Sequence, residues 1–184
     1  MQLAAPPGMD TRPTQAKVRE SLFNMLQADI DGARVLDLFG GSGALALESL
    51  SRGAEYAAVC DMDRKAADVI RRNIEKLQYT DKECRLIVSE WKASLMKLPS
   101  EPFDIVFLDP PYRMDIFPEC TELLRNRGLI SNGSLIVMEH ATGKYSAPSA
   151  LFSLYKERTY GETEIHIYMY EETHNEDLGI SGQL

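Results

Sequence analysis

Short apolar segments alternate with helical segments along most of the chain, and this alternation constrains the fold more than any other feature of the sequence. The five apolar segments are residues 33–39, 56–61, 84–89, 102–109 and 134–140. Segments this short and this apolar are typical of strands that a parallel sheet buries on both faces. Residues 151–160 and 163–170 predict two more strands, joined across Gly161 in a hairpin. The sequence therefore predicts an α/β fold, with a mostly parallel sheet and helices on both of its faces.

The length of 184 residues suits one domain, and 44% hydrophobic with 26% charged residues is the composition of a globular protein. We expect a single domain over residues 1–171 and a polar tail over residues 172–184. A helix over residues 14–30 is expected to precede the first strand. The N-terminus has neither the charged nor the apolar region of a signal peptide, which predicts a cytoplasmic protein.

Cysteine and histidine spacing gives no sign of a metal site or a disulfide framework. The three cysteines, Cys60, Cys84 and Cys120, form no CxxC pair, so we expect each to be a small buried side chain. The three histidines also lack ligand spacing, and no metal is expected.

The net charge of −8 does not by itself indicate a nucleic-acid-binding protein. The negative charge is concentrated near the C-terminus, because the residues from Glu157 onward carry a net charge of −6 and the preceding 156 residues only −2. A local basic face on the body of the protein is compatible with this distribution.

Polar residues follow the predicted strands at the points where ligands bind in open α/β sheets, outside the carboxyl ends of the strands. These residues are Asp37, Asp61, Ser89, Glu90, Asp109, Glu139 and His140. An acid at nearly every strand end exceeds what turn formation requires, which favours a binding site along this edge.

A glycine-rich loop, Gly40-Gly41-Ser42-Gly43, follows the first strand and leads into a helix. Its glycines permit close approach of a ligand to the backbone, and the helix N-terminus offers free N–H groups. The segment 41–46 also satisfies a GxGxxA dinucleotide fingerprint, with Asp61 suitably placed for a ribose diol. The loop therefore predicts a cofactor that contains a nucleoside, without deciding between nicotinamide and other nucleotides.

A second interpretation of the same loop is the nucleophile elbow of an α/β-hydrolase. Ser42, Asp109 and His140 follow one another in the chain order of that triad. The elbow motif is incomplete, however, because Ala44 stands where the second glycine of GxSxG belongs.

The most specific motif is Asp109-Pro110-Pro111-Tyr112, directly after an apolar strand. Consecutive prolines end the strand and fix the backbone. A planar base with an exocyclic amino group fits such a turn, since Tyr112 can stack on the ring while the Asp109 carboxylate and the Pro110 carbonyl accept the amino hydrogens. These bonds localise the nitrogen lone pair and direct it at an electrophilic methyl group.

Residues 37–43, Asp61 and residues 109–112 together resemble the S-adenosylmethionine-dependent class I methyltransferases that methylate amino groups. More narrowly, residues 12–24, 37–54 and 107–112 resemble the RsmD-like family, which methylates the N2 amino group of a guanine in 16S ribosomal RNA. The DPPY motif alone also fits DNA methyltransferases that act on adenine N6 or cytosine N4, which remain an alternative.

The resemblance implies a Rossmann-like sheet of seven strands with the last strand antiparallel, and S-adenosylmethionine as cofactor. The residues implied at the methionine end of the cofactor are Asp37, Phe39, Gly40, Ser42 and Gly43. Asp61 would bind the ribose hydroxyls and Glu90 the adenine amino group. Trp91 would either pack on the adenine or belong to the core.

The resemblance further implies that the flipped target guanine is received by Asp109, Pro110, Pro111 and Tyr112. Candidates for contacts with the RNA are Arg12, Thr14, Arg19 and Arg113. Members of the family usually begin with a basic stretch, whereas the eleven residues before Arg12 contain no Lys or Arg. With the acidic net charge, this suggests that the protein recognises 16S rRNA within an assembled or assembling small ribosomal subunit. Neither a membrane nor an obligate protein partner is expected.

Overall fold

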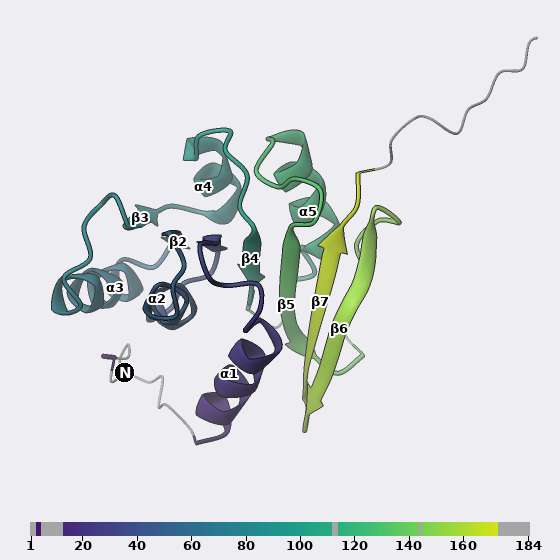
Figure 1. Ribbon diagram of the computed structural model, residues 1–184, viewed down its shortest axis with the longest axis horizontal. Coiled ribbons are helices and arrows are strands. Elements are labelled where there is room, and N and C mark those ends of the chain that lie inside the picture. Colours follow the sequence, from purple (N-terminus) through teal and green to yellow (C-terminus); the bar gives the residue numbers. More distant parts are fainter. Residues whose placement is uncertain (1–2, 5–12, 112–113, 144, 173–184) are drawn as a thin grey trace, which may run out of the picture.

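A mixed sheet of seven strands divides the molecule into two layers of helices (Figure 1). The computed structural model describes residues 3–4, 13–111, 114–143 and 145–172. The helices are α1 (Pro13–Met25), α2 (Ala44–Ser51), α3 (Arg64–Lys76), α4 (Trp91–Lys97) and α5 (Phe117–Asn126). The strands are β1 (Arg34–Asp37), β2 (Tyr56–Asp61), β3 (Cys84–Val88), β4 (Ile105–Leu108), β5 (Leu135–Ala141), β6 (Phe152–Tyr160) and β7 (Thr163–Tyr170).

The strands lie in the order β3-β2-β1-β4-β5-β7-β6. The first five strands are parallel, and β7 is antiparallel to both of its neighbours, β5 and β6. The predicted α/β fold, the seven-stranded sheet and the antiparallel last strand are all confirmed. The hairpin predicted across Gly161 is also present, as β6 and β7.

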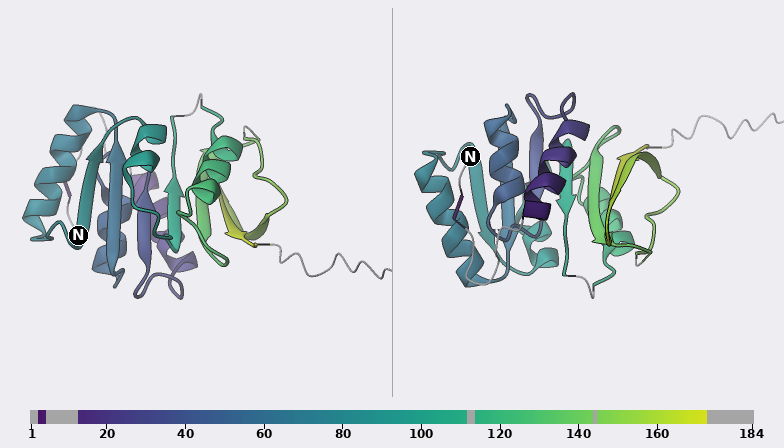
Figure 2. Two further views of the ribbon diagram at one scale, coloured as in Figure 1. Left: turned by 90° about the horizontal axis from the view of Figure 1, so that it is seen from above. Right: turned by 90° about the horizontal axis from the view of Figure 1, so that it is seen from below.

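Each face of the sheet has its own hydrophobic core, because helices cover both faces. Helices α1, α2 and α3 lie side by side on one face (Figure 2) and bury Leu22, Leu47 and Ile70 against it. The opposite face is covered by α4 and α5. Every residue of the central strand β4 is buried, as expected for a strand that is covered on both sides.

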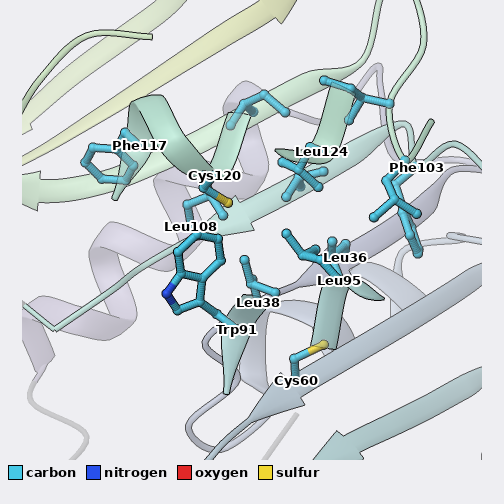
Figure 3. Close-up of a cluster of buried hydrophobic side chains, with 14 of the residues drawn as sticks. Leu36, Leu38, Cys60, Trp91, Leu95, Phe103, Leu108, Phe117, Cys120 and Leu124 are labelled. Atoms are coloured by element: carbon cyan, nitrogen blue, oxygen red, sulfur yellow. The ribbon is translucent and has the colours of Figure 1, made fainter. Parts of the chain in front are cut away.

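The core under α4 and α5 contains two of the three cysteines (Figure 3). Cys60 and Cys120 pack there among leucine and aromatic side chains, and Cys84 lies in the core on the other face. All three thiols are free and buried, which confirms the prediction. Burial raises the pKa of the Cys60 and Cys84 thiols to about 12, so these groups stay neutral at physiological pH.

The helix before the first strand is shorter than residues 14–30, because the regular helical segment ends at Met25. The chain continues through turns in which the Asp29 amide donates to the Leu26 carbonyl at 2.8 Å. Val18, Leu22 and Leu26 are buried, as their helical spacing predicts. No helix in the described ranges is long and apolar enough to span a membrane. The part of the expected tail that follows residue 172 lies outside the described residues.

Gly40 allows the loop after β1 to approach β2 very closely. A Cβ atom at this position would lie only 2.4 Å from Cγ1 of Val59, a side chain that is completely buried. Val59 is β-branched and packed inside the core, so it cannot easily rotate away. The absence of a side chain at Gly40 is therefore a packing requirement.

We expect Gly40→Ala to lower the free energy of unfolding by about 1–3 kcal/mol, because overpacking forces a shift of the loop or of β2. The combination with Val59→Ala, which removes the clashing methyl group, should be less destabilised than the sum of the two single variants. Urea denaturation of the four proteins in a double-mutant cycle measures this coupling. Additive effects of the two substitutions would contradict the proposed contact.

Candidate active site

Four carboxylate side chains gather at the edge of the sheet where its parallel strands end. Asp37 ends β1 and Asp61 ends β2, while Asp109 directly follows β4. Leu108 of β4 pairs with Met138 of β5. The next residues along these two strands, Asp109 and Glu139, therefore lie side by side. The strand-end acids that the sequence predicts on separate segments therefore share one site.

The glycine loop is tied to the end of β2 by two hydrogen bonds. The Gly40 amide donates to the Cys60 carbonyl at 2.8 Å, and the Gly41 amide donates to Oδ2 of Asp61 at 2.8 Å. The other oxygen of Asp61 accepts from the Asp63 amide, also at 2.8 Å. Asp61 thus shapes the loop, and each of its oxygens retains a lone pair for a further donor.

A second side chain supports the loop from α3. Asn73 is buried, and its amide group donates to the Ser42 carbonyl at 3.0 Å. Gly43 at the N-terminus of α2 has a φ of 77°, a left-handed conformation that favours glycine. The loop is therefore held in a defined shape by contacts within the protein.

Asp37 is a buried carboxyl group with an unsatisfied oxygen. Asp37 is 1% exposed, and its Oδ2 has no hydrogen-bond partner in the described part of the chain. Burial raises the pKa of Asp37 to about 7, and the charge of Asp61 adds to this effect, while the backbone N–H groups of Ala46 and Phe39 oppose it. Such an oxygen requires a donor, and a cationic donor satisfies it best.

Asp109 and Glu139 line one small recess beside the loop. The recess is otherwise lined by the apolar residues Leu22, Leu45, Phe107, Leu108, Val137 and Ile165. Asp109 is exposed as a residue, yet desolvation of its carboxyl group by the surrounding protein raises its pKa well above the usual value. The charges of Glu139 and Asp37 act in the same direction. Partial burial also raises the pKa of Glu139.

The turn after β4 contains the two consecutive prolines that follow Asp109. Pro110 is buried and Pro111 is exposed, and the Pro111 carbonyl accepts from the Met114 amide at 2.9 Å. Tyr112 and Arg113, which the sequence assigns to the base and to the RNA, lie outside the described residues. Asp109 lines the recess and Pro110 is the next residue along the chain, while the stacking role of Tyr112 stays a prediction.

Glu90 and Trp91 both have structural roles at the start of α4. Glu90 is the N-cap of α4, and its Oε2 accepts from the Lys92 amide at 3.0 Å. Trp91 is 6% exposed and packs in the core near Leu38 and Leu108 (Figure 3). This arrangement matches the core alternative for Trp91, while a contact between Glu90 and the cofactor stays a prediction.

The other cofactor candidates lie around the loop, whereas the RNA candidates are only partly described. Phe39 is half-buried against the core under α4 and α5, and Ser42 is half-buried within the loop. Arg19 lies half-buried on α1. Arg12 lies outside the described residues, and Thr14 is in α1 without a described side chain.

The hydrolase interpretation is wrong, because His140 does not face Ser42 or Asp109. Its Nδ1 is 3.0 Å from the Ala141 carbonyl, and its Nε2 is 2.7 Å from Nδ1 of His166. His140 packs against Phe117 of α5, on the face of the sheet opposite to the recess. Successive residues of a strand point to opposite faces, so Glu139 at the recess places His140 behind it.

The structure also forms a histidine cluster that spacing in the sequence does not indicate. Ligand atoms of His140, Glu164 and His166 lie within 4.8 Å of one another, close enough to be considered for a metal. The two imidazoles, however, are already hydrogen-bonded to each other, and Nε2 of His166 lies 3.2 Å from a carboxylate oxygen of Glu157. The ring nitrogens of His140 and His166 therefore already have partners on β5, β7 and β6.

Comparison with known proteins places the chain in a family. A family model described as "Conserved hypothetical protein 95" matches residues 1–169. The chain is also 35% identical to ribosomal RNA small subunit methyltransferase D of Escherichia coli over 172 residues, which cover 92% of this chain and 85% of that protein. The chain belongs to the RsmD family.

Other RsmD relatives agree in sequence and in structure. The protein of the same name from Haemophilus influenzae is 31% identical over 159 residues, which cover 85% of this chain and 82% of that protein. The solved structure of the Escherichia coli protein yhhF matches with a TM-score of 0.81 at 35% identity, over 94% of this chain and 93% of that one. The class I methyltransferase fold that the sequence predicts is thereby confirmed.

We expect Asp37→Asn to flatten the dependence of stability on pH. The folded-state pKa of about 7 exceeds the ordinary value of 3.8, so this carboxyl stabilises the fold most below pH 4 and loses that contribution as the pH rises to 7. The variant should therefore have a higher Tm than the wild type at pH 8.

Asp37→Asn should also bind S-adenosylmethionine, the cofactor that the sequence predicts, at least about tenfold more weakly, since an amide offers no charge to an ammonium group.

Thermal unfolding between pH 5 and pH 8 and titration calorimetry with S-adenosylmethionine measure these two effects. Asp104→Asn provides a control, because Asp104 is exposed at the opposite end of β4 and the amide oxygen of asparagine can still accept from the Arg34 amide. Equal slopes of Tm against pH in the wild type and in Asp37→Asn would contradict the assignment.

Proposed function

We propose that the chain transfers a methyl group from S-adenosylmethionine to the N2 amino group of a guanine in 16S ribosomal RNA. The observation that carries the proposal is the position of the Asp109–Pro111 turn beside the glycine loop, since β1 and β4 are neighbours in the sheet. This arrangement brings acceptors for an amine next to a loop suited to a nucleoside cofactor. The names of the RsmD relatives support a small-subunit ribosomal RNA substrate.

The residues around the loop fit S-adenosylmethionine. The unsatisfied oxygen of Asp37 suits the ammonium of its methionine part, and the lone pairs of Asp61 suit the ribose hydroxyls. A Cβ atom at Gly41 would meet no atom within 4 Å, so the backbone at this position is open to close approach by a ligand. When bound, the cofactor supplies an electrophilic methyl group on a sulfonium.

Asp109 and Pro110 prepare the nucleophile. The lone pair of an aryl amine is delocalised into its ring, and acceptors for the two N–H groups localise it on nitrogen. The Asp109 carboxylate and the Pro110 carbonyl supply these acceptors from a turn whose backbone the prolines hold rigid. The raised pKa of Asp109 also makes its carboxylate a better acceptor for the proton that must leave the nitrogen.

The acidic net charge affects how the protein can bind its RNA substrate. With a net charge of −8, the protein gains little from general attraction to phosphates, so Arg12, Arg19 and Arg113 are proposed as local phosphate contacts. We propose that the substrate is 16S rRNA in an assembled or assembling small subunit, where ribosomal proteins supply part of the docking surface. We propose the cytoplasm as the location of this reaction.

Two alanine variants separate the cofactor site from the base site. Asp109→Ala should lower kcat by at least about 100-fold and leave the Kd for S-adenosylmethionine nearly unchanged, because it removes an acceptor for the amine. Asp61→Ala should raise that Kd at least about tenfold, because it removes the acceptor for Gly41 together with the ribose contact. Steady-state kinetics and calorimetry measure both. Near wild-type turnover of Asp109→Ala would refute the mechanism.

The reaction itself is tested with radiolabelled S-adenosylmethionine and small ribosomal subunits that lack native methylation. Digestion of the RNA should yield labelled N2-methylguanosine at a single site, and Asp109→Ala serves as the inactive control. Label in methyladenine or N4-methylcytosine after incubation with DNA would favour the DNA alternative. Stronger labelling of protein-free 16S RNA than of subunits would overturn the proposed assembled substrate.

A further inference from the structure

Glu139 shares the recess with Asp109 because of the register between two strands. Leu108 of β4 pairs with Met138 of β5, and the next residues along each strand are Asp109 and Glu139. Phe107 and Val137, two positions earlier, line the same recess. Side chains alternate between the faces of a strand, so both carboxyl groups project from the same face above these apolar residues.

No described group satisfies either carboxyl. No hydrogen bond joins the carboxyl group of Asp109 or of Glu139 to another group within the described ranges, in contrast to Asp61, whose two oxygens both accept from backbone amides. The two carboxyl groups repel each other, and this repulsion contributes to the raised pKa of Asp109. Two adjacent acceptors with no donor among the described groups suit a ligand that brings several N–H groups at once.

Guanine presents such a row of donors. Its N1–H lies directly beside the 2-amino group, so the two groups point N–H bonds in nearly the same direction. Adenine differs at this edge, because its N1 carries a lone pair. A carboxylate that faces N1 therefore accepts from guanine and is repelled by adenine.

Building on the proposed function, we infer that Glu139 accepts the N1–H of the target guanine while Asp109 and Pro110 accept the hydrogens of its 2-amino group. Leu22, Leu45 and Ile165 supply an apolar lining next to these two contacts. Glu139 is thus the residue that selects guanine, whereas Asp109 acts on the nitrogen that is methylated. The division of roles deepens the proposed reaction by naming what recognises its substrate.

The test uses 2-aminopurine, which keeps the 2-amino group of guanine but has a lone pair at N1. Small subunits are reconstituted with this base at the position that the labelling experiment identifies. The wild type should prefer guanine over 2-aminopurine by about 100-fold or more in kcat/KM, because the analogue leaves the carboxylate unpaired and facing a lone pair.

Glu139→Gln should reduce this preference at least about tenfold, since the amide N–H₂ of glutamine can donate to N1 of 2-aminopurine. The variant should also unfold at a higher temperature than the wild type, because one of two repelling charges is removed. A stable variant with a changed base preference shows that the change does not come from misfolding. Glu164→Gln is the matched control on the neighbouring strand β7; Glu164 does not line the recess, and the base preference should stay unchanged.

A base preference in Glu139→Gln equal to that of the wild type would overturn the inference while leaving the proposed reaction intact. Equal methylation of guanine and 2-aminopurine by the wild type would overturn it as well. Failure of the wild type to form N2-methylguanosine on guanine-containing subunits is the separate result that would overturn the proposed function.

Discussion

The parallel direction of β1, β2, β4 and β5 is the constraint on which the rest of this structure depends. Parallel strands end at one edge of a sheet, so the acids that follow them meet there, although more than a hundred residues separate Asp37 from Glu139. Gathering like charges in a partly buried place is unfavourable by itself. The two hydrophobic cores, one on each face of the sheet, stabilise the fold against this cost.

The glycine loop shows how the site is organised before any ligand binds. Asp61 accepts from Gly41, Asn73 donates to Ser42, and Gly40 packs against β2 with no space for a side chain. These contacts fix the loop by interactions inside the protein, so the ordering of the backbone does not have to be supplied by the cofactor. Oδ2 of Asp37, in contrast, has no hydrogen-bond partner within the described ranges, and we propose that the cofactor supplies its donor.

Local patterns in the sequence were sufficient for most of the elements and for the meeting of the acids at one edge of the sheet. The apolar runs predicted the strands, and the polar residues after them predicted the edge proposed for the site, because both depend on neighbours along the chain. Roles that depend on distant residues were not predictable in this way. Glu90 and Trp91 are adjacent in sequence, yet one caps α4 and the other fills the core under α5. His140 has the chain order of a triad residue but hydrogen-bonds His166 of β7.

The sequence by itself determined the α/β class, the glycine loop, the rigid turn at Asp109 and membership of an amine-methylating family, because each depends on consecutive residues. Only the tertiary structure decided which side chains share a space. The register of β4 with β5 pairs Asp109 with Glu139 in one recess, and the alternation of faces along β5 turns His140 away from it. Both results arise from hydrogen bonds between strands, which no local stretch of sequence encodes.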